Sequence, residues 1–286
     1  MSESPHPRAD ELSWLSTREL MALLQAEDRV AVDAVGEHLD RVAEAVDAIA
    51  TRLRAGGHLH YFGAGTSGRL AALDAVECAP TFGLEPGVVI AHDAGDGEAE
   101  DDRRRGAGEA REAALQRADA VVGVSASGRT GYVLAAVGEA RAAGSLVVGL
   151  SCAPGSPLGA ASDVAIEVET GAEVIAGSTR LKAGTVQKVV LNMLSTGVFI
   201  RLGRTYRGRM VDVVASNDKL RARAAAIVAD LTGASAAAVQ RALAESGGSA
   251  KLAILMLRCG LAAGEARSRL SSVGGDLAVA LGEGGR

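Results

Sequence analysis

The chain has 286 residues, of which 48% are apolar and only 2% aromatic, and its formal net charge is −5. This length is enough for one large domain and a smaller one. The acidic balance gives no basic footprint for nucleic acid, and no apolar run reaches the ~18 residues that a membrane span needs. We therefore expect neither a nucleic acid nor a membrane as a partner.

The cysteines and the first residues indicate a cytoplasmic protein. Cys78, Cys152 and Cys259 are odd in number and lack metal-ligand spacing, which is typical of reduced thiols. Residues 1–11 are polar and carry no signal-peptide core. The five histidines are not expected to cluster, so no metal site is expected.

Residues 1–56 are expected to form a helical arm. Residues 16–19 have the pattern of a capping box at the start of a short helix. Apolar residues then recur at spacings of three and four from Val32 to Leu53, which predicts one long amphipathic helix that Gly56 ends. The apolar face of this helix either packs on its own domain or serves as a dimer arm, and both interpretations stay open.

From residue 58 onwards, apolar strands alternate with helices. Strands are expected at 59–62, 88–90, 120–124, 146–150 and 164–168, a loop leading into a helix at 93–112, and helices at 69–78, 130–143 and 179–202. Continuously apolar strands separated by helices predict a parallel sheet that is covered on both faces. Ligands of such sheets bind at the carboxyl ends of the strands, near a topological switch point.

The first of these strands enters a glycine- and hydroxyl-rich segment, residues 63–68, which we call the first turn. A helix follows and is expected to stop at Pro80. Strand, tight turn and helix N-terminus form a phosphate cradle, because glycines allow close approach and the first helical amides point at an anion. A lone GxGxxG pattern is weak evidence, and an ordinary strand-to-helix connection is the alternative. The hydroxyls of Thr66 and Ser67 favour a monophosphate.

Residues 121–129 repeat the pattern of residues 61–69. In both segments an apolar strand enters a small turn that contains Ser-Gly-Arg. We call residues 123–130 the second turn. Two such turns on one parallel sheet can face one ligand from two sides, so together they predict a phosphosugar site.

After Val214 the sequence becomes a series of short helical runs. They are separated by Gly or Ser and cover residues 217–231, 235–244, 250–257 and 262–270. We interpret this part as a small helical bundle in which Met256 fills the core.

Four long stretches resemble one family. Their sequences are GAGTSGRLAALDAVECAPTFG (63–83), SASGRTGYV (125–133), GSTRLKAGTVQKVVLNMLSTGVFIRLG (177–203) and MVDVVASNDKL (210–220). They are similar to the N-acetylmuramic acid 6-phosphate etherases, which are built on the sugar isomerase (SIS) domain, and the resemblance covers most of the chain.

The resemblance implies an α/β fold, a three-layer αβα parallel-sheet SIS domain at residues 57–215. An N-terminal helical arm at 1–56 precedes it and a small C-terminal helical domain at 216–286 follows. It also implies a cytosolic homodimer that needs neither cofactor nor metal. Its substrate is a phosphorylated amino sugar, N-acetylmuramate 6-phosphate. Cleavage of the D-lactyl ether with water gives N-acetylglucosamine 6-phosphate and D-lactate during cell-wall recycling.

Two acidic residues are implied as catalytic. Glu77, in the last helical turn, is expected to be the proton donor, because the helix end disfavours its charge by ~0.3–1 kcal/mol. Counting back from Ser125 places the second family glutamate at Glu100, which is expected to be an ionised base because it leads into a helix N-terminus. The loop before Ser125 is shorter than is usual in the family, so Glu98 and Asp101 stay open for this role.

The resemblance implies substrate contacts at the two turns, namely at Thr66, Ser67, Gly68, Ser125, Ser127, Gly128 and Thr130. Arg69 and Arg129 are expected to pair with carboxylates such as Asp74 rather than with phosphate, and the role of Lys182 is not assigned. Two alternatives stay open: a non-catalytic phosphosugar sensor and a sugar-phosphate isomerase on the same fold. The presence of Glu77 and of the ECAPTFG stretch favours the etherase.

Overall fold

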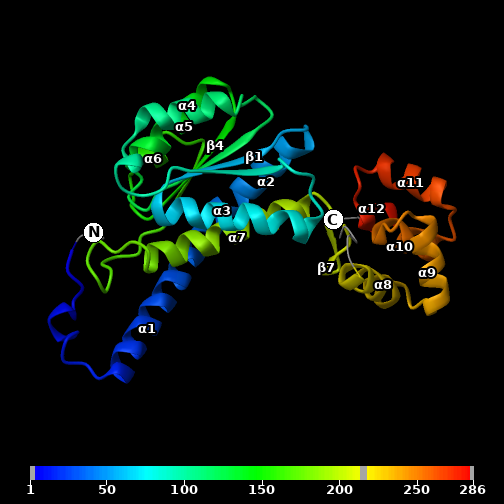
Figure 1. Cartoon of the computed structure of the whole chain (residues 1–286), viewed down its shortest axis with the longest axis horizontal. Coiled ribbons are helices and arrows are strands. Elements are labelled where there is room, and N and C mark those ends of the chain that lie inside the picture. The colour runs from blue at the N-terminus through cyan, green and yellow to red at the C-terminus, as the bar shows by residue number, and fades with distance from the viewer. Residues whose placement is uncertain (1–3, 213–217, 284–286) are drawn as a thin grey trace. The chain divides into compact units, whose positions relative to one another are not determined.

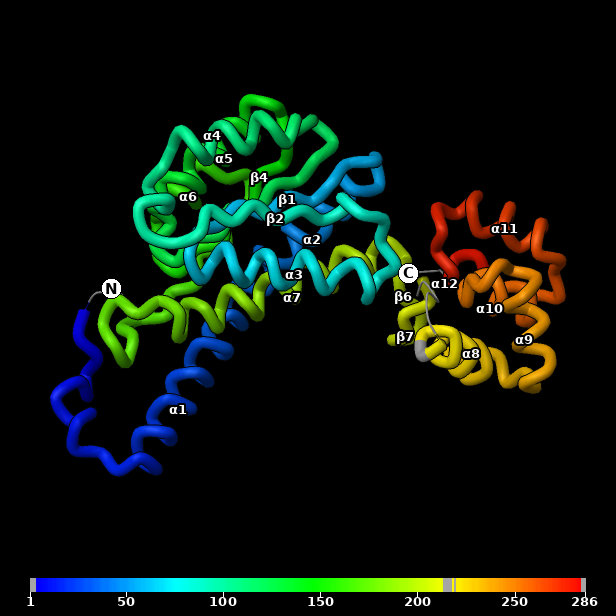
Figure 2. The backbone as a smooth tube through the Cα atoms, in the orientation of Figure 1, coloured from blue at the N-terminus to red at the C-terminus, as the bar shows by residue number. Residues whose placement is uncertain are grey.

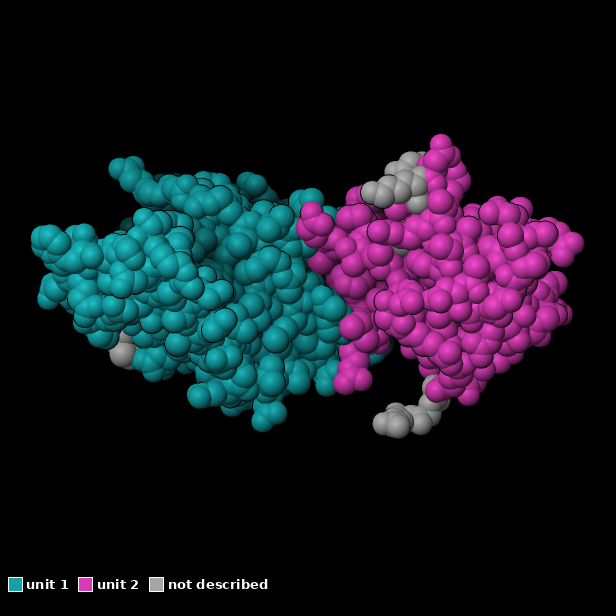
Figure 3. Space-filling view, turned by 90° about the horizontal axis from the view of Figure 1, so that it is seen from below, with its two compact units in different colours: residues 1–76, 87–197 teal, residues 77–86, 198–286 magenta. Residues whose placement is uncertain are grey.

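The computed structural model of the chain describes residues 4–212 and 218–283. The chain divides into two compact units. The first contains Met1–Val76 and Gly87–Gly197, and the second contains Glu77–Pro86 and Val198–Arg286 (Figure 3).

The first unit is built on a five-stranded sheet. Its strands are β1 (Leu59–Gly63), β2 (Val89–Asp93), β3 (Ala120–Val124), β4 (Leu146–Ser151) and β5 (Val164–Glu167). All pairs are parallel and the order is β2-β1-β3-β4-β5. The predicted parallel sheet is therefore confirmed. In this order the direction of winding reverses between β1 and β3, which makes that place the topological switch point.

Helices cover both faces of the sheet, as the alternating pattern predicts. One face carries α4 (Arg103–Glu112), α5 (Gly131–Ala142) and α6 (Pro157–Ala160), and the other carries α2 (Leu39–Arg54), α3 (Gly65–Phe82) and α7 (Lys182–Arg201) (Figures 1 and 2). The core under α5 is fully buried and includes Phe62, Val121, Tyr132, Val137 and Leu158. This burial explains why the strands are apolar along their whole length.

The N-terminal part differs from the prediction of one long helix. The capping box of Ser16 is confirmed, but α1 (Thr17–Val35) ends at a 3₁₀ turn, η2 (Gly36–His38), before α2 begins. Glycine lowers helix propensity by ~1 kcal/mol, which favours a break at this point. The apolar face of α2 packs on β3, β4 and β5, so this part of the pattern is explained by packing on its own domain.

Helix α3 differs from the prediction at both ends. It begins at Gly65 and continues past Pro80 to Phe82. Proline removes one amide donor, that to the Val76 carbonyl, and one such loss near a helix end is tolerated. In the same stretch the Thr81 hydroxyl donates to the Glu77 carbonyl at 2.7 Å. Gly83 then ends the helix with φ +60°, a conformation that favours glycine.

The second unit contains the predicted helical bundle. Its helices are α8 (Asp218–Thr232), α9 (Ala236–Glu245), α10 (Ala250–Cys259), α11 (Ala263–Ser272) and α12 (Leu277–Ala280), and two short antiparallel strands precede them, β6 (Thr205–Tyr206) and β7 (Arg209–Met210). Met256 lies in the core, as predicted. Val214, Asn217 and the expected domain boundary at 215/216 lie outside the described residues.

Among the described residues, no single helix is long and apolar enough to cross a membrane. One helix pair, Leu220–Thr232 and Ala236–Glu245, passes that test by length and composition only, with a bend of 115° at its break.

Candidate functional site

The two turns begin side by side at the switch point of the sheet. Gly63 at the end of β1 is the register partner of Val124 at the end of β3. Both turns therefore leave the same edge of the sheet from neighbouring strands. This is the position at which open parallel sheets bind ligands.

The first turn runs directly into the first helical turn of α3. The Gly65 amide donates to the Gly95 carbonyl at 2.7 Å, and the Gly68 amide donates to the Ala64 carbonyl at 3.2 Å. Among the described residues, no carbonyl accepts from the amides of Thr66 and Ser67. These two amides lie at the positive end of the helix dipole, so they are suited to an anion.

The second turn is held by its own hydroxyls. Ser125 Oγ lies 2.8 Å from Thr130 Oγ1. Ser127 is exposed, and its Oγ accepts a hydrogen bond from the Arg129 amide at 3.2 Å. The structure thus brings Ser125 and Thr130 into contact and leaves the Ser127 side chain at the surface.

Packing within the chain explains why glycine stands at positions 68 and 128. A Cβ atom added at Gly68 would lie 2.1 Å from Asp93 Oδ1. At Gly128, where φ is +64°, an added Cβ atom would lie 2.4 Å from Ser156 Oγ. Both glycines are therefore required by neighbouring protein atoms, which the expectation of close ligand approach did not foresee.

Glu100 lies against the start of α3. It ends a 3₁₀ turn, η3 (Gly97–Glu100), and a Cβ atom added at Gly65 would lie 2.8 Å from Glu100 Oε1. Glu100 is half-buried, whereas Glu98 and Asp101 are exposed. Of the three acids left open by the sequence, Glu100 is the one whose carboxylate contacts the first turn.

The expectation that its position favours the ionised form of Glu100 is wrong. Burial raises the pKa of Glu100, and the negative charges of Asp96 and Asp101 raise it further.

Glu77 lies on α3 and is exposed, and because α3 continues to Phe82, Glu77 does not lie in the last helical turn, where it was expected. It belongs to the second unit, whereas Glu100 and both turns belong to the first.

Arg69 pairs with a carboxylate, as expected, but its partner is Asp96 and not Asp74. Its Nη1 donates to both carboxylate oxygens of Asp96, at 2.7 and 2.8 Å, and its Nη2 donates to Thr66 Oγ1 at 3.3 Å. The expected partner Asp74 is buried and accepts instead from the hydroxyls of Tyr61 and Ser195. Arg69 thereby fixes the loop of Asp96 to the first turn.

Lys182 holds the first helix to α7. Its Nζ lies 2.5 Å from Glu27 Oε2 on α1, and its backbone amide donates to Glu173 Oε2 at 2.9 Å. Lys182 and Glu173 are buried. Because Glu27 lies 155 residues away along the chain, no local pattern around Lys182 predicts this contact.

The histidines cluster, contrary to expectation. Ligand atoms of His58, His60 and Asp119 all lie within 4.8 Å of one another, and His60 Nδ1 lies 3.2 Å from His92 Nε2. Residues two apart on a strand share one face, which the expectation overlooked. Asp119 also accepts from the amides of His58 and Gln116, each at 2.8 Å, so the cluster ties together the segments that precede β1 and β3.

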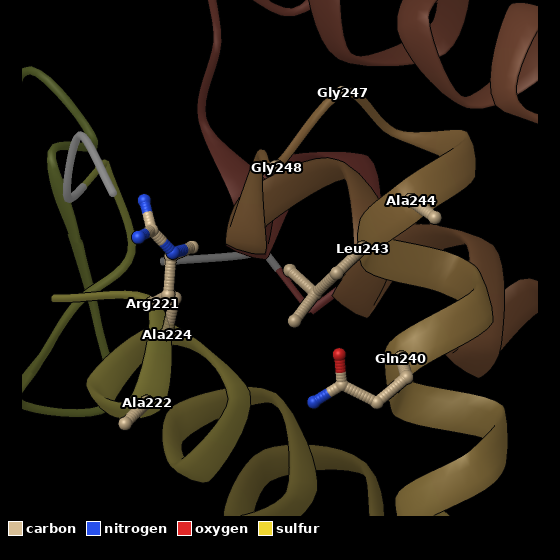
Figure 4. A pocket seen from close by; sticks show the side chains of 8 residues that line it. All are labelled: Arg221, Ala222, Ala224, Gln240, Leu243, Ala244, Gly247 and Gly248. Carbon is tan, nitrogen blue, oxygen red and sulfur yellow. The ribbon is translucent and has the colours of Figure 1, made fainter. Parts of the chain in front are cut away.

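The second unit contains a separate pocket of about 460 Å³ (Figure 4). Side chains of α8 and α9, among them Arg221, Gln240 and Leu243, line it together with Gly247 and Gly248. None of the site residues predicted from the sequence lines this pocket.

A family model described as the SIS domain matches residues 26–152. The chain is 51% identical to the N-acetylmuramic acid 6-phosphate etherase of Rubrobacter xylanophilus, over 100% of this chain and 97% of that protein. It is 48% identical to the protein of the same name from Streptomyces avermitilis, over 98% of this chain and 93% of that protein.

Solved structures show the same fold at lower identity. A phosphoheptose isomerase from Francisella tularensis gives a TM-score of 0.52 at 17% identity, covering 65% of this chain and 99% of that one. The phosphoheptose isomerase of Neisseria gonorrhoeae gives a TM-score of 0.51 at 19% identity, covering 64% of this chain and 98% of that one.

Proposed function

The chain belongs to the N-acetylmuramic acid 6-phosphate etherase family, and we propose that Glu100 and Glu77 exchange the protons of its reaction while the two turns bind the substrate. The protein is a carbon–oxygen lyase of peptidoglycan recycling. It cleaves the D-lactyl ether of N-acetylmuramate 6-phosphate with water and releases N-acetylglucosamine 6-phosphate and D-lactate.

The chemistry requires one base and one acid. The ether oxygen on sugar C3 is a poor leaving group, but ring opening makes C1 an aldehyde and the C2 hydrogen acidic. A base removes that proton, the C3–O bond breaks, and an acid protonates the departing lactyl oxygen. Water then adds across the C2=C3 bond, with its oxygen on C3 and a proton on C2, so the net change consumes one water. Two carboxyl groups in different environments suffice for these transfers.

Glu100 is the proposed base, and the observation that carries this assignment is its carboxylate against Gly65. Its raised pKa is compatible with the role, because a general base works best when its pKa lies near the operating pH. Glu77 is the proposed acid. The ECAPTFG stretch supports it.

The phosphate is proposed to lie at the N-terminus of α3. The amides and hydroxyls of Thr66 and Ser67 supply donors there, and the helix dipole favours a negative charge. Ser125, Ser127 and Thr130 of the neighbouring strand end are proposed to contact the sugar or its phosphate, with Gly68 and Gly128 shaping the backbone of each turn. No metal or cofactor enters this proposal.

We also propose that the protein is a cytoplasmic homodimer. Two apolar residues of the N-terminal segment, Val32 and Leu39, stay about half exposed, at 47% and 50%, and so support a contact with a second copy. We propose that the chain has three parts: the N-terminal helical arm at 1–56, the SIS domain at 57–215 and the C-terminal helical domain at 216–286. Light scattering at micromolar concentration tests the dimer, and the mass of one chain would contradict it.

The direct test is D-lactate release from N-acetylmuramate 6-phosphate by purified protein in the presence of a chelator. We expect stoichiometric D-lactate and N-acetylglucosamine 6-phosphate. A phosphosugar sensor would bind without releasing lactate, and an isomerase would convert a sugar phosphate without releasing lactate. Dependence on added metal would also contradict the proposed mechanism.

A further inference from the structure

Gln187 on α7 lies beside the first turn. The Ser67 hydroxyl donates to Gln187 Oε1 at 3.0 Å, and both residues are buried, with 7% and 1% of their surfaces exposed. One helical turn before Gln187, a Cβ atom added at Gly184 would lie 3.6 Å from Thr66 Cγ2. Helix α7 therefore packs directly on the proposed phosphate-binding residues.

The amide nitrogen of Gln187 has no partner. In the part of the chain that the structure describes, Gln187 Nε2 is the buried side-chain polar atom without a hydrogen bond. A buried donor without an acceptor costs ~1–3 kcal/mol, and orphaned N–H groups are rarer than under-satisfied carbonyl oxygens. Turning the amide over would place the oxygen at this position instead of the nitrogen.

The direction of the Ser67 hydrogen bond bears on phosphate binding. A serine hydroxyl has one proton, and here that proton is donated to Gln187 Oε1. The hydroxyl can then offer a ligand only lone pairs, whereas phosphate oxygens need donors. With the amide reversed, Nε2 donates to Ser67 Oγ and the hydroxyl proton becomes available to the phosphate.

We propose that Gln187 is a positioning residue of the phosphate cradle: with its side-chain amide turned over, Nε2 donates to Ser67 Oγ and sets the Ser67 hydroxyl as a donor to the phosphoryl group. The inference rests on the proposed function, in which Ser67 binds phosphate. The rearrangement changes neither the shape nor the charge of the side chain, and only the direction of one hydrogen bond is reversed.

Gln187→Glu tests the proposal, because glutamate has the same shape but only accepts hydrogen bonds when it is ionised. At pH 8 we expect its affinity for N-acetylglucosamine 6-phosphate, measured by calorimetry, to fall by ~10–100-fold relative to wild type, the scale of one hydrogen bond to a charged group. As the pH falls and the carboxyl is protonated, it can donate again, so the ratio to wild type measured at each pH returns toward one.

Gln187→Met is the matched control. Methionine fills a similar volume and neither takes nor supplies the Ser67 proton, so we expect a smaller loss whose ratio to wild type does not change with pH. Equal losses and equal pH profiles in the two variants would overturn the proposal, because the lost donor of the glutamate variant would then have no effect of its own. Wild-type affinity in the glutamate variant would also overturn it.

Ser67→Ala separates the two levels of inference. If it weakens binding while the Gln187 variants bind like wild type, the positioning role fails and the phosphate site stands. If Ser67→Ala leaves the affinity unchanged, the phosphate lies elsewhere and both inferences fail. Should Gln187→Glu not fold, Ser67→Ala is compared in wild-type and Gln187→Met backgrounds. The proposal predicts a smaller loss in the second background, and equal losses contradict it.

Discussion

The first and second turns share the sequence Ser-Gly-Arg after an apolar strand, yet they have different structures. In the first, Ser67 is a buried residue of α3 and Arg69 is tied to Asp96. In the second, Ser127 and Arg129 are exposed, and α5 begins only at Gly131.

The difference comes from what surrounds each turn. Helix α7 covers the first turn and supplies Gln187 as a partner for its serine. The second turn instead packs its glycine on Ser156, whose segment continues into α6. A short motif thus predicts which strand ends carry hydroxyls, whereas packing decides which hydroxyl is buried at a helix N-terminus. The following predictions test this asymmetry.

The largest effect is expected at Glu100, the acid that contacts the first turn. Glu100→Gln should reduce D-lactate release by ~100-fold or more, the scale of removing a positioned general base, and should also abolish exchange of the C2 hydrogen with heavy water. Glu77→Gln should lose lactate release yet keep some exchange, because C2 deprotonation needs only the base. Mass spectrometry of recovered substrate measures the exchange.

Glu98→Gln, an exposed acid two residues earlier, is the control and should stay near wild-type activity. If exchange survives in Glu100→Gln and vanishes in Glu77→Gln, the two roles are reversed. If Glu100→Gln keeps full activity, Glu98 or Asp101 is the second acid.

The next effect compares the two serines. Ser67→Ala should weaken binding of N-acetylglucosamine 6-phosphate by ~10–100-fold, since a hydrogen bond to a charged group contributes ~1.5–3 kcal/mol. Ser127→Ala should weaken it less, because water competes for an exposed hydroxyl. Calorimetry on both variants measures the difference. An equal or larger loss in Ser127→Ala would reverse the asymmetry, and unchanged affinity in both would move the phosphate elsewhere.

A third prediction compares the strands beneath the turns, where His60 on β1 is the register partner of Val121 on β3. Burial lowers the pKa of His60 to about 4, with a further contribution from His92. The folded state therefore disfavours protonation of His60. The contribution of neutral His60 to the free energy of unfolding is complete above the unfolded pKa of ~6.5 and is lost as the pH falls from there toward 4. Unfolding free energy should drop by on the order of 2 kcal/mol over this window.

Urea unfolding across pH 4–7 measures this loss. His60→Val, which copies the residue of the neighbouring strand, should show a shallower decline over the same range. An equally steep decline in the variant would assign the acid sensitivity to other groups.

The smallest effect is expected from the two arginines. Arg69→Ala removes an exposed ion pair with Asp96, and Arg129→Ala removes an exposed side chain of the second turn. Surface pairs contribute little and are screened by salt, so neither change should shift the unfolding temperature strongly, and any loss in Arg69→Ala should shrink at 1 M salt. A large loss of phosphosugar affinity in Arg129→Ala would instead indicate a phosphate contact.

Much of the fold follows from local sequence. Continuous apolar runs predicted the five parallel strands, and Ser16 with Glu19 predicted the cap of α1. The errors arose where one local signal competed with another. Pro80 did not stop α3, because loss of a single amide donor near a helix end is tolerated, and the Val32–Leu53 pattern did not reveal the break at η2.

The sequence by itself determined the parallel sheet, the two hydroxyl-bearing turns at strand ends of that sheet and, through its long motifs, the etherase family. Only the tertiary structure decided that Glu100 rather than Glu98 or Asp101 contacts the first turn, that Ser67 bonds to Gln187, and that His58 and His60 meet Asp119 while His60 also meets His92. The physical reason is that periodicity and turn chemistry act over a few residues. The position of an acid after a loop, and the partner of a buried hydroxyl 120 residues away, depend on how distant segments pack.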